Sequence, residues 1–102
     1  MNATLYIPGQ KPLVVSSEGL HLPSGETGFV PQSDAAAEFL GCTLTQVDIL
    51  VSGEDFVAYS IFDSDGDINY KAMVAIVEVS GIHFELDNED ELLRGRILLL
   101  HS

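Results

Sequence analysis

Two stretches of this chain, Ala72-Met73-Val74-Ala75-Ile76-Val77 and Ile97-Leu98-Leu99-Leu100, are apolar at every position. A strand with one face in water alternates apolar and polar residues, whereas a strand covered on both faces does not. Both stretches are therefore predicted to be strands of a sheet whose two faces are covered.

The rest of the second half of the chain predicts further strands and turns. Phe56–Phe62 has the composition of a strand, and Asp63-Ser64-Asp65-Gly66-Asp67 has that of a turn. Ile68–Val79 is predicted to be the long returning strand. Ser80-Gly81 turns into a strand over Ile82–Leu86, and after one helical turn opening at Asn88 the last strand is predicted over Arg96–His101.

The first half of the chain begins with a predicted hairpin and contains the predicted helices. Ala3–Ile7 and Leu13–Val15 are β-rich, and Pro8-Gly9-Gln10-Lys11-Pro12 between them is typical of a turn. Residues 16–32 are rich in Gly and Pro and predict irregular structure. A helix is predicted over residues 34–40, with Ser33 as N-cap and Gly41 as the left-handed residue that ends it.

Residues 43–52 carry two competing patterns. Thr43, Thr45, Val47 and Ile49 alternate as in a strand, whereas Leu44, Val47, Leu50 and Val51 have helical spacing, with Thr43 available as a cap. Of the two we favour a second helix. The predicted fold is thus a single α+β domain over residues 1–102, with an N-terminal β-hairpin and one or two short helices packed on an antiparallel β-meander.

One or two helices are few for a sheet that needs both faces covered. Self-association would hide the remaining part of the second face, so the sequence predicts a homodimer. If the second helix and the irregular segment 16–32 together cover that face, a monomer suffices.

The charge of the chain is strongly negative. Sixteen acidic residues face four basic ones, Lys11, Lys71, Arg94 and Arg96, for a net charge of −12. Nucleic-acid affinity comes largely from Lys and Arg that displace counterions, so DNA and RNA are disfavoured partners. An anionic surface attracts basic protein surfaces and speeds encounter with them; the simpler interpretation is solubility alone.

Carboxylates are densest in two segments, which are the predicted partner-binding residues. They are Asp63, Asp65 and Asp67 in the predicted turn, and Glu85, Asp87, Glu89, Asp90 and Glu91 in the acidic run. The sequence therefore predicts a non-catalytic protein-binding module of the inhibitor, immunity or regulatory adaptor kind.

The sequence contains no motif that predicts catalysis or the binding of a metal or cofactor. Asp63-Ser64-Asp65-Gly66-Asp67 begins like an EF-hand loop, but the sixth position is Ile68 and the twelfth is Val74, so no calcium site is predicted. The single cysteine, Cys42, is interpreted as a small buried apolar residue. We predict no catalytic residues, no metal and no cofactor, with a small ligand-binding or enzymatic α+β roll as an alternative.

Residues 35–50 resemble a helix-turn-helix. Ala37, Gly41, Val47 and Leu50 stand where that motif has its small residue, its turn glycine and its apolar pair. Ser52–Tyr59 looks like the join to the wing in excisionase-like and MerR-like winged helices, so the resemblance implies a regulator that binds DNA. The candidate recognition helix, however, offers no Arg or Lys to base edges or phosphates.

No apolar run approaches the length of a membrane span, so a membrane protein is not predicted. Met1-Asn2-Ala3-Thr4 lacks a basic region followed by an apolar one, which argues against a secretory signal. A cytoplasmic location is expected.

Overall fold

The computed structural model describes residues 1–23, 27, 34–62, 66–81 and 92–102. Within these residues the chain forms an antiparallel sheet with the strand order β2-β1-β5-β4-β3 and two α-helices, an α+β fold. The N-terminal β-hairpin and the α+β class with an antiparallel sheet are as predicted. The strands are β1 (Asn2–Tyr6), β2 (Leu13–Val15), β3 (Val47–Ser52), β4 (Phe56–Ile61) and β5 (Ile97–His101).

β5 is the central strand, and its uninterrupted apolar sequence follows from that position. All four residues from Ile97 to Leu100 are buried. Leu98 and Leu100 belong to the core on one face of the sheet, and Ile97 and Leu99 to the core on the other. The prediction that this strand is covered on both faces is confirmed.

Helix α1 (Asp34–Leu40) covers one face of the sheet, as its local sequence predicts. Ala36, Ala37 and Leu40 are buried, and their small or flexible side chains let the helix lie close to the strands. The helix ends at Gly41, whose φ of 74° is a left-handed conformation that other residues rarely adopt. The N–H groups of Gly41 and Cys42 both donate to the carbonyl of Ala37.

The predicted second helix over residues 43–52 is wrong. Thr43 does begin a helical turn, but this is the single 3-10 turn η1 (Leu44–Gln46), and β3 follows directly. The alternating β-branched residues decide the outcome because β4 offers them a partner, with Val47 opposite Ile61 and Val51 opposite Ala58. Tertiary pairing thus overrides a balanced local preference.

The predicted strand over Ile68–Val79 is also wrong. It is occupied by helix α2 (Tyr70–Ser80), and Ile68 forms only an isolated bridge to Arg94. An apolar run can be a buried strand or a buried helix, and here helical spacing places Ala72, Met73 and Ile76 on the buried face. Asn69 caps the helix, and Gly81 (φ 74°) ends it. The strand predicted over Ile82–Leu86 and the turn at Asn88 lie outside the described residues.

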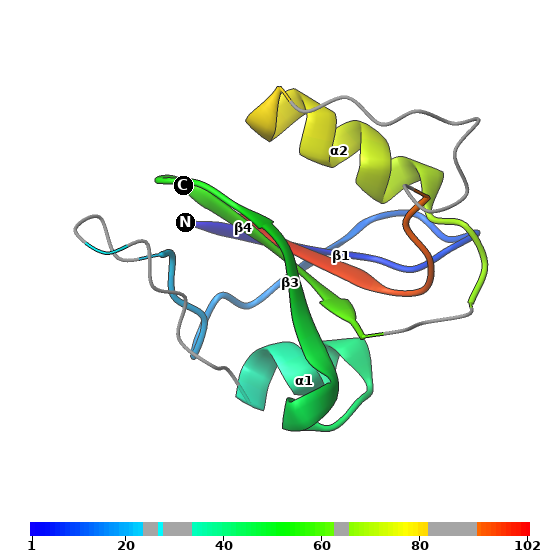
Figure 1. Ribbon diagram of the computed structural model, residues 1–102, viewed down its shortest axis with the longest axis horizontal. Coiled ribbons are helices and arrows are strands. Elements are labelled where there is room, and N and C mark those ends of the chain that lie inside the picture. The colour runs from blue at the N-terminus through cyan, green and yellow to red at the C-terminus, as the bar shows by residue number, and fades with distance from the viewer. Residues whose placement is uncertain (24–26, 28–33, 63–65, 82–91) are drawn as a thin grey trace.

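Helix α2 covers the face of the sheet opposite to α1, as Figure 1 shows. Ala72 and Ile76 pack there against Ala58, Ile97 and Leu99. Both faces of the central strands are therefore covered within one chain. The homodimer was expected because part of one sheet face would otherwise have been exposed, and α2 covers that face.

Within the described part of the chain, neither helix has the length and apolar character needed to cross a membrane.

Asn69 holds the start of α2 to the end of β1 and to the segment just before β5. Its amide nitrogen donates to the carbonyls of Tyr6 (3.0 Å) and Gly95 (2.8 Å), while its amide oxygen accepts from Ala72 N–H (3.2 Å). Its backbone N–H donates to the carbonyl of Leu93 (2.8 Å). The residue is only 2% exposed, so these bonds replace water that cannot reach the groups.

We expect Asn69→Asp and Asn69→Ala each to lower the free energy of unfolding by about 2–4 kcal/mol. Asp caps a helix as well as Asn does, but its carboxylate cannot donate to the carbonyls of Tyr6 and Gly95. Denaturant unfolding measures the loss, with the exposed Asn2→Asp as the matched control. If Asn69→Asp left the free energy of unfolding unchanged, Asn69 would act only as a helix cap.

Candidate functional site

The structure describes one of the predicted partner-binding residues. Asp67 is exposed, and its carbonyl accepts a hydrogen bond from Gly95 N–H at 2.9 Å, which ties the end of the β4–α2 connection to the start of β5. The others, Asp63, Asp65, Glu85, Asp87, Glu89, Asp90 and Glu91, lie outside the described residues.

Every acidic residue that the structure describes is exposed. They are Glu18, Asp34, Glu38, Asp48, Glu54, Asp55, Asp67 and Glu78, and they come from both helices, from β3 and from the loops. Among the described residues, none of these carboxylates forms an ion pair with a basic side chain. Their charge is therefore not neutralised at short range within this part of the protein.

Three of the four basic side chains instead hold backbone carbonyls. Lys71 Nζ donates to Gln10 (3.2 Å), Arg94 to Gly66 (3.3 Å) and Arg96 to Phe39 (3.3 Å). These contacts fasten the β1–β2 turn to α2, the residues before α2 to β5, and the C-terminal end of α1 to β5. The three carbonyls that accept these bonds lie in three different segments of the chain.

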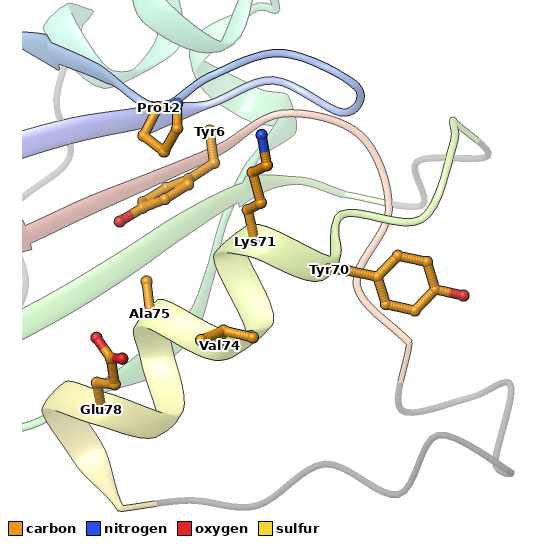
Figure 2. Close-up of a pocket in the computed structure, with 7 residues that line it drawn as sticks. All are labelled: Tyr6, Pro12, Tyr70, Lys71, Val74, Ala75 and Glu78. Atoms are coloured by element: carbon orange, nitrogen blue, oxygen red, sulfur yellow. The ribbon is translucent and has the colours of Figure 1, made fainter.

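An open groove lies between α2 and the β1–β2 hairpin (Figure 2), with a volume of about 350 Å³. Its lining is mostly apolar or aromatic, with one charged residue of each sign. The lining residues are Tyr6, Pro12, Tyr70, Lys71, Val74, Ala75 and Glu78. Val74 and Tyr70 are 59% and 56% exposed, which is high for side chains of this kind.

The Tyr6 ring crosses this groove, and its environment is set by burial and by Glu78. Burial raises the pKa of the Tyr6 hydroxyl, and the nearby Glu78 carboxylate raises that pKa further because it opposes a second negative charge. In Figure 2 the Glu78 carboxylate and the Lys71 ammonium both point toward the hairpin side, from positions two turns apart on α2. The groove thus combines an aromatic face with a carboxylate.

None of the groove residues is among the residues predicted from the sequence. Tyr6 and Pro12 belong to the hairpin and the others to α2, which the sequence analysis interprets as a strand. The signals that predict the helix are local, namely Asn69 as a cap, Gly81 as its end and the helical spacing of Ala72, Met73 and Ile76. No local signal brings Tyr6 to that helix.

The described residues do not assemble a metal site. They contain no group of three or more His, Cys, Asp or Glu that could hold a metal ion. Cys42, predicted to be a small buried apolar residue, packs against the α1 core but is only half-buried, and burial raises the pKa of its thiol.

Tyr59 carries a buried polar atom that no described residue bonds. The hydroxyl of this β4 residue is fully buried and makes no hydrogen bond within the part of the chain that the structure describes. Burial raises the pKa of Tyr59, since a phenolate in the α1 core would lose its hydration.

Comparison of the chain with family models, curated proteins and solved structures finds no match in any of the three.

We expect Glu78→Gln to lower the pKa of the Tyr6 hydroxyl toward, but not fully to, its ordinary value of 10.0, because burial still acts after the charge is removed. Tyrosine ring shifts followed by NMR across alkaline pH measure this. Glu38→Gln on α1 is the control and should leave Tyr6 unchanged. Equal responses to the two substitutions would mean that Glu78 does not act on Tyr6.

We expect Tyr59→Phe to leave the free energy of unfolding unchanged or to raise it by up to about 1 kcal/mol, because the hydroxyl has no bond to lose. Since the pKa of Tyr59 is raised in the fold, its contribution to stability is complete below about pH 10 and declines as the pH rises further. The wild-type protein should therefore lose more stability than Tyr59→Phe above that pH. Denaturant unfolding at neutral and alkaline pH tests both statements, and a loss of 1 kcal/mol or so at neutral pH would contradict the first.

Proposed function

We propose that this protein is a non-catalytic binding domain whose carboxylate-rich surface meets a basic protein partner, in the manner of an inhibitor, an immunity protein or a regulatory adaptor. The observation that carries the proposal is where the charged side chains lie and what they contact. All the described carboxylates are exposed, and three of the four cations bond to backbone carbonyls. A surface of this kind produces an unbalanced negative field that steers cationic partners.

A role in binding DNA has less support. Reading bases in the major groove through the helix-turn-helix resemblance would require a helix after Gly41, and Val47–Ser52 form strand β3. Phosphate contacts would require cations on one face, and Lys71, Arg94 and Arg96 serve three different contacts.

An enzymatic role also has less support from the groove. Ligand pockets that bury a small molecule usually have volumes of roughly 300–1,000 Å³ and enclose most of the ligand. The groove beside α2 is near the lower end of that range and open to solvent. It is better suited to one side chain of a partner than to a substrate that must be shielded from water.

The proposal concerns a domain that acts in the cytoplasm as a single chain. The homodimer expected from the sequence would have covered a sheet face that α2 covers itself. A net charge of −12 per chain also opposes the close approach of two copies.

The proposal predicts that the chain binds a basic protein and does not bind polyanions. Titrated with a histone as a generic basic probe, the protein should bind at low salt, and the affinity should fall on the order of tenfold or more as salt approaches 0.15 M. It should pass unretained through heparin and duplex DNA columns at low salt. Retention on either column would overturn the proposal, as would failure of the folded protein to bind the basic probe.

Charge-matched variants locate the binding surface. Neutralising Asp63, Asp65 and Asp67 together to Asn should weaken binding more than neutralising Glu18, Asp34 and Glu38 together to their amides. Each variant loses three negative charges, so a difference in their binding affinity depends on where those charges lie. Equal losses would contradict the assignment of Asp63–Asp67 to the encounter surface.

A further inference from the structure

We infer that the groove between α2 and the β1–β2 hairpin receives an arginine side chain of the basic partner, with its guanidinium against the Tyr6 ring and the Glu78 carboxylate. This inference rests on the proposed function and names the anchor site on that surface. It follows from the charge, the aromatic face and the size of the groove.

The groove holds one carboxylate and one ammonium group, which are not paired with each other. Lys71 and Glu78 both line it, but the Lys71 ammonium donates to the carbonyl of Gln10 at 3.2 Å and is directed toward the hairpin (Figure 2). Glu78 is exposed and has no basic partner among the described residues. A cation that enters the groove therefore finds a carboxylate that is not already paired.

The neutral part of the lining suits a planar cation on an apolar stem. The half-buried Tyr6 offers an aromatic ring, and Val74 and Ala75 offer an aliphatic surface along α2. Arginine stacks on aromatic rings and can bond to a carboxylate through two N–H groups, whereas the lysine ammonium is a compact and strongly hydrated charge. The groove is therefore expected to prefer arginine over lysine.

The exposed apolar residues around the groove are consistent with a protein partner. Val14 on the edge strand β2 is 84% exposed, and Tyr70 and Val74 on α2 are each more than half exposed. Interfaces commonly place such aromatic and aliphatic residues next to an Arg anchor.

The test is an NMR titration of the full chain with three blocked tripeptides, acetyl-Gly-Xaa-Gly-amide with Xaa as arginine, lysine or citrulline. Citrulline keeps the shape of arginine and removes its charge. We expect the arginine peptide to shift amide signals of β1, the β1–β2 turn and residues 70–78 of α2. The lysine peptide should bind more weakly, and the citrulline peptide weakest of the three.

Matched variants assign the effect to Glu78. Glu78→Gln should weaken binding of the arginine peptide about threefold to fivefold, the range expected for an exposed charge pair. Glu38→Gln, which removes the same charge from α1, should change it less than about twofold. The amide spectrum of each variant reports whether it is folded.

Two results would overturn the inference: peptide shifts spread evenly over the surface, or equal losses in Glu78→Gln and Glu38→Gln. If the basic protein still binds in either case, the groove is not the anchor and the proposed function stands. If the arginine peptide binds in the groove but the basic protein does not bind, the proposed function fails and the groove remains an arginine site.

Discussion

The position of α2 on the sheet depends on the buried amide of Asn69. This one side chain bonds to the last residue of β1, to Gly95 just before β5 and to the first turn of the helix. The partners are backbone groups in part-buried or buried positions, and a buried group left without a bond costs about 1–3 kcal/mol. The amide therefore couples three segments that are distant in sequence. It also places α2 over Ala58, Ile97 and Leu99, where Ala72 and Ile76 complete the second core.

The cations of this protein serve the fold and the carboxylates face the solvent. Arg94 and Arg96 each hold a carbonyl near an end of β5, and Lys71 holds the carbonyl of Gln10 in the β1–β2 turn. A basic side chain bonded to a carbonyl keeps its charge but is fixed in place. The acidic residues thus repel one another at the surface, which opposes compactness, while the two apolar cores hold the chain together. This division allows a strongly negative surface on a small domain.

A negative field and an apolar groove contribute differently to recognition. The field acts over distances near the Debye length, about 8–10 Å at physiological salt, and raises the rate of encounter with any basic surface. It cannot distinguish between such surfaces. The Tyr6 ring and Glu78 act only at contact, where the shape and bonding of a side chain matter. In the proposed mechanism the carboxylates bring a basic partner close and the groove selects among the side chains that it presents.

Parts of this structure follow from local sequence alone. The helix over residues 34–40 has strong helix formers and a glycine where a left-handed residue is needed, and these act within a few residues of one another. The uninterrupted apolar sequence of Ile97–Leu100 requires burial on both faces whatever covers them. The net charge of −12 is a property of the composition. Each of these is independent of how distant segments meet.

Tertiary structure decided what those local signals left open. The apolar residues from Ala72 to Val77 satisfy either a buried strand or a buried helix, and Thr43 to Ser52 satisfy either a helix or an edge strand. The pairing of β3 with β4, and of Asn69 with carbonyls 63 and 26 residues away, selects between them. The groove is likewise formed by residues 6 and 12 and by residues 70–78, so no local pattern encodes it. A preference between two backbone conformations is small for each residue, and burial against a distant partner is large enough to reverse it.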